Sequence, residues 1–434
     1  MTSEGPRRAS PRLAKGTELL GVYKGSGCIE APYIARLADG RMLEVSPLLY
    51  QLVAALDIEG ELEGVAARLS SELVRPISAD SVEYLIDRKL RPLGVLADPA
   101  ETESPRPSAP ALLGLTLQAG VVPPRVVRAF TTLLRPLFLP PVVVGALVAL
   151  LVGDVAVLRG HAVGRSVHHV LTEPGLLLLV VALTVVAGAL HELGHATASR
   201  YGGAEPGTIG AGVYLIWPVF YNDLQDSHRL GRGGRLRCDL GGVYFNVVFI
   251  LLLFGLLGLT GFGPLLVVIV AQHLAILQQF LPFVRLDGYY VVSDLAGVPD
   301  LFGRIKPIIS SLIPGHVAGR LVTQLKPSAR AIVTAWVLIT VPLLGAALLL
   351  LGTNMPSLVV GTAKAVATQA GALASAVRTG AAPTAALSGI QLLFVMIPVV
   401  GLTVTLARAL RPVRLSRFHH RLGRLVLTFG APRP

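Results

Sequence analysis

The pattern of hydrophobic and polar positions divides the chain into two parts. In the N-terminal part, hydrophobic and polar residues alternate over short stretches, and the remainder consists of long apolar runs. From Glu18 to about Ala97, alternating stretches such as "ELLGVY", "APYIARL" and "RMLEV" predict short β-strands. Asp39-Gly40 between the last two stretches predicts a hairpin turn. Ser46-Pro47 then favours the start of a helix, because serine caps the first turn and proline is preorganised for it.

Two more helices are expected after this one. The second begins near Leu62, and Asp80 with Glu83 predicts a capping box for the third, "SVEYLIDRKL". A strand hairpin followed by three short helices predicts a small α+β, winged-helix-like domain over residues 16–98. It is flanked by a basic tail over residues 1–15, expected to be disordered, and by a flexible Pro-rich linker over residues 99–120.

Beyond the linker the pattern changes to long apolar runs. They cover roughly residues 136–158, 175–200, 240–260, 264–285, 331–352 and 389–410. Each run is long enough for a helix across a hydrocarbon core of about 30 Å. The predicted fold class is therefore a polytopic α-helical membrane protein, with about six transmembrane helices over residues 121–410 and a basic tail over 411–434. Residues 355–388 fit either an extracytoplasmic amphipathic helix or a short re-entrant pair.

Composition supports a membrane protein. Hydrophobic residues make up 53% of the chain and charged residues only 15%, where a soluble protein carries about a quarter. The net charge of +12 first suggests nucleic acid, but arginine and lysine lie mainly in the tails and between the apolar runs. That distribution follows the positive-inside rule, so we expect the bilayer and no nucleic acid as partner. It predicts a multi-pass protein of the cell (plasma) membrane with both termini in the cytoplasm.

The second apolar run contains the stretch "AGALHELGHATA", which places ionisable groups where burial is costly. His191 and His195 are four residues apart and share one face of a helix, so their imidazoles can hold one zinc ion (Zn²⁺). Glu192 is then free to act as the catalytic base that takes a proton from zinc-activated water. The alternative, that these three side chains satisfy one another in a helix bundle, is disfavoured by the cost of polar burial.

A catalytic zinc ion usually has a third protein ligand and one open position. The best candidate is Asp287, at the cytoplasmic end of the fourth apolar run, because its expected depth agrees with that of His191. Gly288 beside it permits close backbone approach or a positive φ. Alternatively, Asp287 only caps a helix end.

With these residues, the chain resembles the site-2 protease family of intramembrane zinc metalloproteases. The motif HELGH at 191–195 and LDG at 286–288 appear in the family's order. Gly242-x-x-x-Asn246 resembles the family's G-x-x-x-N on the intervening helix. Gln279 stands where the family usually has asparagine, and glutamine can make the same hydrogen bonds from a longer stem. The resemblance implies substrate-positioning roles for Gly242, Asn246, Gln279 and Gly288.

A narrower resemblance covers roughly residues 120–350. "LDGYYVVSDLAGVPDL" and "FYNDLQDSHRL" are similar to the bacterial peptide zinc metalloprotease branch, and residues 16–98 are similar to PqqD-like peptide-recognition domains. This implies a zinc-dependent metalloendopeptidase that removes the leader from, or otherwise matures, a small ribosomally made peptide near the cytoplasmic face. The leader is expected to add as a strand beside "RMLEV" and to pack against "SVEYLIDRKL", where Arg88, Lys89 and Arg91 suit an acidic sequence.

Other functions stay open on the sequence alone. One is regulated intramembrane cleavage of a membrane-anchored signalling protein, and another is a non-catalytic part in peptide export or immunity. The N-terminal domain alternatively binds DNA or serves only stability. Residues 208–220 are expected to form a hairpin, or to dip into the membrane, and to offer an edge to an extended substrate. His273 is expected to make a helix–helix hydrogen bond or to line a water path. The sequence does not name the substrate, the cleavage position or the oligomeric state.

Overall fold

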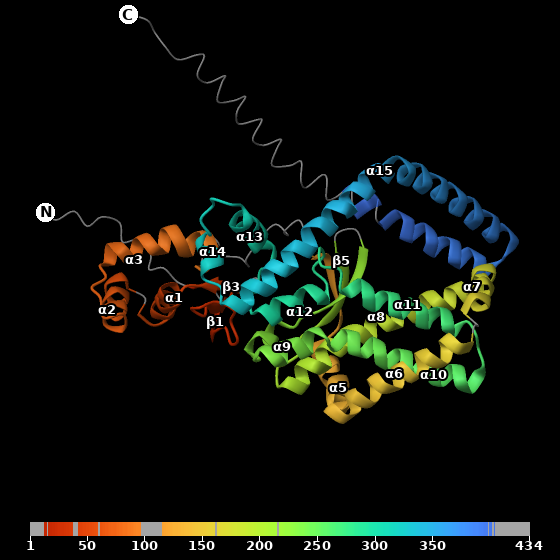
Figure 1. Cartoon of the computed structure of the whole chain (residues 1–434), viewed down its shortest axis with the longest axis horizontal. Coiled ribbons are helices and arrows are strands. Elements are labelled where there is room, and N and C mark those ends of the chain that lie inside the picture. Colours follow the sequence, from red (N-terminus) through yellow and green to blue (C-terminus); the bar gives the residue numbers. More distant parts are fainter. Residues whose placement is uncertain are drawn as a thin grey trace, which may run out of the picture. The chain divides into compact units, whose positions relative to one another are not determined.

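The structure is a computed structural model that describes residues 13–14, 16–37, 42–59, 61–96, 115–160, 163–214, 217–397, 399–401 and 403 (Figure 1). The chain divides into two units, each of which gathers segments that are distant in the sequence. The first unit consists of Met1–Ala109, Gln225–Leu236 and Tyr290–Leu338, and the second of Pro110–Leu224, Arg237–Tyr289 and Ile339–Pro434.

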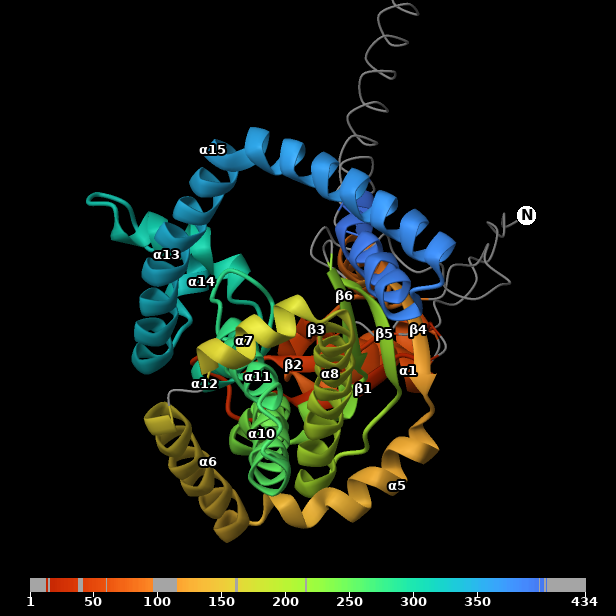
Figure 2. The same ribbon diagram turned by 90° about the vertical axis from the view of Figure 1, so that its right-hand side faces the viewer.

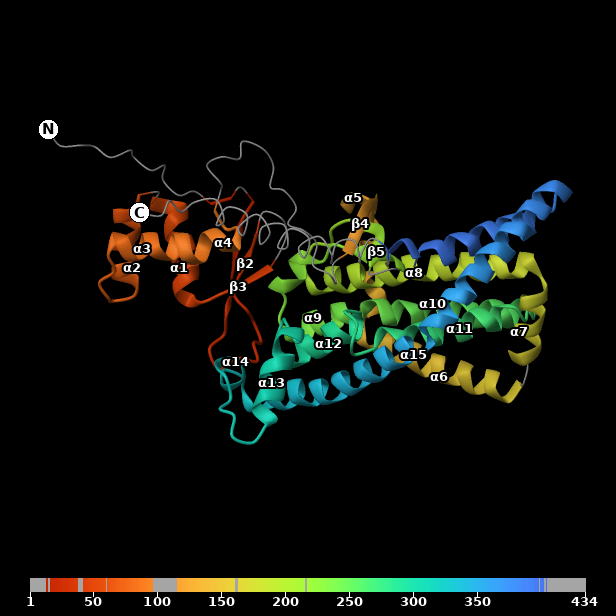
Figure 3. The same ribbon diagram turned by 90° about the horizontal axis from the view of Figure 1, so that it is seen from above.

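The first unit begins with an antiparallel sheet in the order β1-β2-β3. Its strands are β1 (Glu18–Val22), β2 (Tyr33–Arg36) and β3 (Met42–Val45), so β3 lies at an edge. Helices α1 (Pro47–Glu59), α2 (Leu62–Glu72) and α3 (Ala79–Leu85) follow (Figure 3). Their apolar side chains form one core. These strands and helices confirm the elements predicted from the hydrophobic pattern. The predicted Asp39-Gly40 turn lies outside the described residues.

The first turns of α1 and α3 show which of the predicted capping residues make a cap. Ser46 Oγ accepts a hydrogen bond from Leu49 N–H at 3.3 Å, as expected for a cap of α1. The capping box predicted at Asp80 is wrong, because α3 already begins at Ala79 and Ser78 Oγ accepts from the backbone N–H of Ser81. After α3 the chain continues as a π-helical turn, η1 (Ile86–Leu90), and a short α4 (Arg91–Leu93).

The N-terminal strands are held to later segments of the first unit by main-chain hydrogen bonds. Gly27 N–H donates to Gly297 O at 2.8 Å, and Lys326 N–H donates to Gly27 O at 2.8 Å. A Cβ atom on Gly27 would lie 2.0 Å from Ala296 O, so only glycine fits this approach. Residues 16–98 therefore share a unit with 225–236 and 290–338, which corrects the expectation of a domain joined only through a linker.

The later segments of the first unit are mostly short helices. They include η3 (Gln225–Arg229), η4 (Phe302–Arg304), α13 (Ile305–Leu312) and α14 (Arg320–Thr323). Two further helices, α9 (Arg232–Asp239) and α12 (Asp287–Ala296), contribute residues to both units.

The second unit is mainly helical. Its helices include α5 (Pro124–Leu134), η2 (Arg135–Phe138), α6 (Pro140–Gly160), α7 (Val163–Thr172), α8 (Pro174–Gly202), α10 (Gly241–Thr260) and α11 (Leu265–Gln279). Among the described residues, five helices are long and apolar enough to cross a membrane: Pro140–Arg159, Pro174–Gly202, Gly241–Thr260, Pro327–Thr379 and Ala382–Gly401. The chain is thus a helical membrane protein, and these helices match five of the six predicted spans.

The fourth and fifth predicted spans differ from the expectation. The fourth is shorter, because α11 ends at Gln279 and the Pro-containing stretch "FLPFVRL" follows it. The fifth is longer, because α15 (Pro327–Thr379) continues as one helix past Pro342 and Pro356. A proline inside a helix removes one backbone donor and bends the helix without always ending it. The re-entrant pair is therefore wrong for residues up to 379.

A second sheet has the order β4-β5-β6. Strand β4 (Leu115–Val122) overlaps the end of the linker predicted over residues 99–120, so the predicted linker is too long. Strands β5 (Ile209–Tyr214) and β6 (Trp217–Asn222) form the predicted hairpin, and β6 is an edge strand that packs against α8 (Figure 2). A Cβ atom at Gly188 of α8 would lie only 3.1 Å from the Phe220 ring.

Helices α8, α10 and α11 lie side by side in the second unit (Figures 1 and 3). Their apolar side chains, among them Ile250, Leu253 and Ile269, form a buried cluster. In the C-terminal half of α8, near the start of α10, a Cβ atom on Gly194 would lie 2.3 Å from Gly241 O. Small residues of this kind let two membrane helices approach closely, and this contact brings the histidines of α8 against α10.

Candidate metal centre

The two histidines of the predicted motif meet at the crossing of α8 and α10. His191 and His195 are one helical turn apart on α8, and each is only 7% exposed. Their Nε2 atoms are 3.1 Å apart, with the rings nearly perpendicular. The spacing in the sequence therefore does place both imidazoles on one buried face.

Asp287 joins them from a different element. It is the first residue of α12 rather than the last of the fourth span, which corrects its predicted location. Its Oδ2 lies 3.1 Å from His191 Nε2, and its Oδ1 lies 3.3 Å from His195 Nε2. Within the described residues, one ligand atom from each of these three side chains lies within 4.8 Å of the others.

The orientation of His195 is fixed by a backbone carbonyl. Its Nδ1 lies 2.7 Å from Cys238 O. A carbonyl oxygen can only accept a hydrogen bond, so Nδ1 carries a proton and Nε2 is the ring nitrogen that faces the other ligand atoms. This is the arrangement by which a second hydrogen bond orients a metal-binding histidine.

The donor set fits a zinc ion. Ligands about 2.0–2.1 Å from a tetrahedral zinc ion are separated by about 3.3 Å, close to the observed separations of 3.1, 3.1 and 3.3 Å. Asp287 Oδ2 is buried, and although it is near His191 it makes no aligned hydrogen bond with any described residue. A buried carboxylate oxygen without a hydrogen bond is costly unless a cation satisfies it.

The surroundings of Asp287 favour the charged form of its carboxyl. Burial by itself would raise its pKa, but the imidazoles of His195 and His191 outweigh burial and hold the pKa of this carboxyl below its usual range. The site thus offers one anion and two nitrogens, a mixed set that zinc accepts.

Gly242 of α10 makes room for the three ligands. A Cβ atom there would lie 2.5 Å from the Nε2 atoms of both His191 and His195. Real Cβ atoms do not approach so closely, so any side chain at 242 would push the imidazoles apart. The glycine singled out by sequence therefore borders the ligand atoms directly.

Glu192 lies beside the ligands but is not one of them. Its carboxylate interacts electrostatically with His195, His191 and Asp287. Its backbone carbonyl accepts a hydrogen bond from Asn222 Nδ2 at 3.0 Å, which ties α8 to the end of β6. The acid is therefore placed next to the donor set and next to an edge strand.

The other predicted positioning residues lie near the site to different degrees. Asn246 is buried on α10, one turn after Gly242. Gln279 is the last residue of α11, and its carbonyl oxygen would lie 2.9 Å from a Cβ atom on Gly288. Gly288 is thus needed for a close backbone approach, while no direct contact joins Asn246 or Gln279 to the ligand atoms among the interactions described.

His273 is separate from this centre. Its Nε2 lies 3.2 Å from Asp154 Oδ1, and its Nδ1 lies 2.9 Å from Ile269 O. The bond to Asp154 joins α11 to α6, which confirms the predicted helix–helix hydrogen bond.

Sequence reasoning missed a buried charged network in the first unit. Arg235 Nε donates to Asp294 Oδ1 at 2.6 Å, and the Tyr23 hydroxyl donates to the same oxygen at 2.8 Å. Arg235 also donates to the carbonyls of Lys24 and Leu230, and its guanidinium lies over the Tyr23 ring. The available signal was Asp294 in the stretch "VVSDLA", since an aspartate in a largely apolar helix needs a partner.

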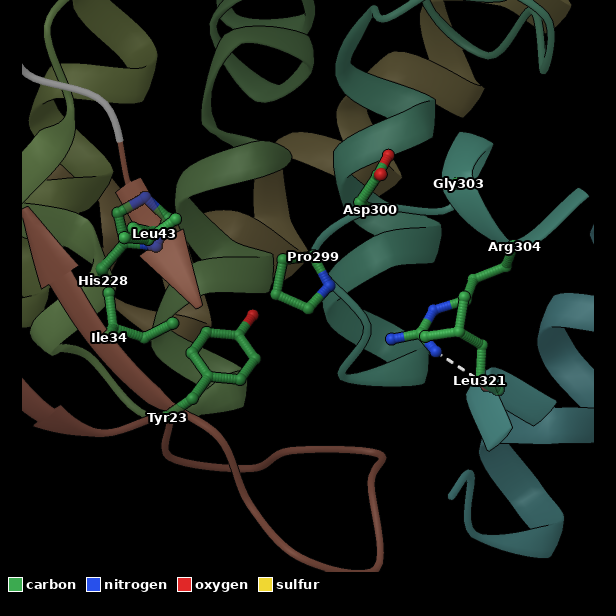
Figure 4. Close-up of a pocket in the computed structure, with 9 residues that line it drawn as sticks. All are labelled: Tyr23, Ile34, Leu43, His228, Pro299, Asp300, Gly303, Arg304 and Leu321. Carbon is green, nitrogen blue, oxygen red and sulfur yellow. Dashed lines mark hydrogen bonds between the residues drawn. The ribbon is translucent and has the colours of Figure 1, made fainter. Parts of the chain in front are cut away.

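The first unit also has a cavity of about 490 Å³ beside its sheet (Figure 4). Its lining consists of Tyr23, Ile34, Leu43, His228, Pro299, Asp300, Gly303, Arg304 and Leu321. Burial lowers the pKa of His228, with Arg235 acting in the same direction and Asp294 opposing it. Leu43 belongs to the edge strand β3, so the cavity borders the strand at which a leader peptide is expected to add.

Comparison with known proteins gives no relative: no family model, curated protein or solved structure matches this chain.

Proposed function

We propose that this chain is a zinc-dependent endopeptidase that cleaves peptide bonds at the membrane, as its resemblance to site-2 proteases implies. One observation carries the proposal. Two helical histidines and a distant aspartate, 92 residues after His195 in the sequence, bring their ligand atoms within 4.8 Å of one another, with a glutamate adjacent. This is the donor set and the base that metal-assisted hydrolysis requires.

The roles follow from the positions of the side chains. His191, His195 and Asp287 would hold the ion, and the hydrogen bond from His195 to Cys238 O would orient one imidazole. When bound, zinc polarises a carbonyl and makes water a better nucleophile near neutral pH. Glu192 would take the proton from the attacking water and then deliver it to the leaving amine.

The edge strand β6 supports a way to hold an extended substrate. A substrate helix hides its amides and must unwind to be cut. An unwound segment can pair with β6 by main-chain hydrogen bonds, and Asn222 at the end of this strand is bonded to the backbone of Glu192. In this account Gly242 and Gly288 keep the site open, and Asn246 and Gln279 position the substrate.

We further propose a small ribosomally made precursor as substrate, with its leader bound by the first unit. Strand β3 lies at the edge of its sheet, and Arg88 and Lys89 are exposed on η1. Arg91 is paired with Asp87 at 3.0 Å, so Arg88 and Lys89 are the cations available to an acidic leader. Regulated cleavage of a membrane-anchored signalling protein is the alternative.

The first experiment measures zinc content and cleavage in the full chain, purified in detergent. We expect about one zinc ion per chain, lost in His191→Ala and weakened in Asp287→Ala. Glu192→Gln should keep zinc and lose cleavage, because it removes the base and no ligand. His273→Ala is the matched control, a histidine of the apolar helices that should keep both. A zinc-free Glu192→Gln protein with a zinc-loaded Asp287→Ala protein would reverse these roles.

The substrate is tested with short precursors encoded near the gene and with membrane-anchored regulators. Cleavage of a precursor, slowed in Arg88→Glu/Lys89→Glu but unchanged in Arg91→Glu, supports leader recognition on η1. Cleavage of a regulator only, with the precursor untouched, would replace the proposed substrate with the alternative.

The proposed orientation places both termini in the cytoplasm. It is tested by labelling Leu230→Cys in intact cells, where an impermeant reagent should fail to reach position 230. Labelling from outside would refute the orientation.

A further inference from the structure

The segment from α13 to α14 in the first unit presents a row of large apolar side chains to its surroundings. The exposed fractions are 38% for Ile309, 51% for Leu312, 46% for Ile313, 94% for Val317 and 46% for Leu321. The chain between the two helices stands out from them as a loop (Figure 2). Large apolar side chains that are exposed along one segment are unfavourable in water and are typical of an interaction site.

The row is held in a defined shape. Ile308 and Val322, at its two ends, are fully buried, and Arg304 Nη1 donates to Leu321 O at 2.7 Å. Between them His316 N–H donates to Ile313 O at 3.2 Å. Pro314 and Gly315, the latter with φ of 83°, are the central residues that a type II turn prefers. The apolar side chains therefore face outward because the opposite side of the segment is packed.

Positive charge borders the row. Lys306 and Arg320 are exposed on α13 and α14, and neither forms an ion pair with any described residue. In the whole sequence no aspartate or glutamate follows Asp300. The charge of this segment is thus not balanced by acidic side chains later in the chain.

We propose that Ile305–Leu321 is a membrane-interface element that binds anionic lipid. The apolar row would enter the boundary between headgroups and acyl chains, and Lys306 and Arg320 would meet lipid phosphates. Helix α15, which is apolar enough to cross a membrane, begins at Pro327, six residues after Leu321. The chain is therefore near the bilayer surface at this point, whatever the function of the metal centre.

A bilayer suits this segment better than a second copy of the chain. A symmetric dimer through the same row would bring Lys306 and Arg320 of both copies together, because a two-fold interface uses the same patch twice. Like charges at such a contact are unfavourable. By contrast, each lysine or arginine near an anionic membrane strengthens the binding of the protein to that membrane by about five-fold.

The test places a polarity-sensitive fluorophore on Val317→Cys in the full chain. The protein is reconstituted into phosphatidylcholine vesicles with or without phosphatidylglycerol, and quenching by lipid-borne nitroxide is measured. Cys28 and Cys238 are buried, so unmutated protein treated with the same reagent gives the background. Val74→Cys is the matched control, since Val74 is a valine of the same unit with 92% exposure.

We expect the label at 317 to be quenched, about two-fold or more strongly in the anionic vesicles, and the label at 74 to stay as in water. Adding Lys306→Glu/Arg320→Glu should remove the dependence on phosphatidylglycerol. A label at 317 that stays water-exposed in both vesicles overturns the proposal. Protection that depends on the amount of protein per vesicle, without lipid quenching, overturns it in favour of a second copy.

Discussion

Among the described residues of the second unit, two clusters of histidine and aspartate differ in how their polar atoms are satisfied. At the α6–α11 contact, both ring nitrogens of His273 face acceptors, Asp154 and Ile269 O. At the α8–α10 contact, the Nε2 atoms of His191 and His195 face each other and Asp287. The first arrangement is complete as a hydrogen-bonded pair, whereas the second directs three ligand atoms towards one point.

A structural polar cluster and a metal site therefore differ in whether each buried acceptor has a hydrogen-bond donor. The buried Arg235–Asp294 pair of the first unit belongs with the first kind, because one carboxylate oxygen accepts from both Arg235 and Tyr23. The Asp287 Oδ2 atom is buried yet makes no hydrogen bond with the residues that the structure describes. Burial does not distinguish the Arg235–Asp294 pair from the cluster at Asp287, since both are largely buried, but the satisfaction of their acceptors does.

The largest effect is expected from Gly242→Ala. The added Cβ atom would lie 2.5 Å from both imidazole Nε2 atoms, so we expect zinc affinity to fall by about 100-fold or more, as for severe changes around a metal site. Gly255→Ala on the same helix is the control, because a Cβ atom there meets nothing within 4 Å. Competition with a zinc chelator measures both variants. Equal affinities would mean that the ligands do not meet at Gly242.

A second large effect is expected from Arg235→Gln in the first unit. It leaves the Asp294 carboxylate buried without its cation, which costs about 3 kcal/mol, or about 100-fold faster local opening. Hydrogen exchange of peptides covering 23–28 and 290–297 measures this opening. Arg68→Gln, which breaks an exposed pair with Glu72, should change exchange by less than about three-fold. Slow exchange in Arg235→Gln would show that the network does not stabilise the unit.

A smaller effect is expected at the structural histidine. A double-mutant cycle of His273→Gln and Asp154→Asn should give a coupling of about 0.6 kcal/mol, typical of hydrogen bonds between membrane helices. Zinc content should not change in any of these variants. Loss of zinc in His273→Gln would erase the distinction drawn between the two clusters.

The smallest effect concerns pH. The pKa of His228 lies below its ordinary value of 6.5, chiefly because of burial. The unfolded chain therefore binds a proton more readily, so the contribution of His228 to stability is present above pH 6.5 and is lost as pH falls through the folded pKa. His228→Gln should flatten the pH dependence of exchange in the first unit below pH 6.5. An unchanged dependence would contradict this assignment.

Much of this organisation follows from the sequence, because its causes are local. The period of apolar residues predicts the N-terminal strands and five of the long helices, and the four-residue spacing of His191 and His195 predicts a shared face. The expected depth of Asp287 also selects this residue as the third ligand, although it begins α12 beyond the end of α11.

The remaining features depend on distant partners, which one sequence does not reveal. The Gly27–Gly297 contact and the Arg235–Asp294 pair join segments far apart in the chain. Strand β4 was missed because its ladder partner, β5, lies about 90 residues later in the sequence, beyond any local pattern. The continuation of α15 past Pro356 depends on the helix tolerating a missing donor, which a local rule treats as a stop.

The most direct test of the central claim is zinc X-ray absorption on the full-length Glu192→Gln protein, which should load with metal but not turn over. We predict one zinc ion with two imidazole nitrogens at about 2.0–2.1 Å and carboxylate oxygen at about 2.0–2.2 Å, and loss of the imidazole signal in His191→Ala. Zinc bound by other ligands, with a spectrum unchanged in His191→Ala and Asp287→Ala, would contradict it.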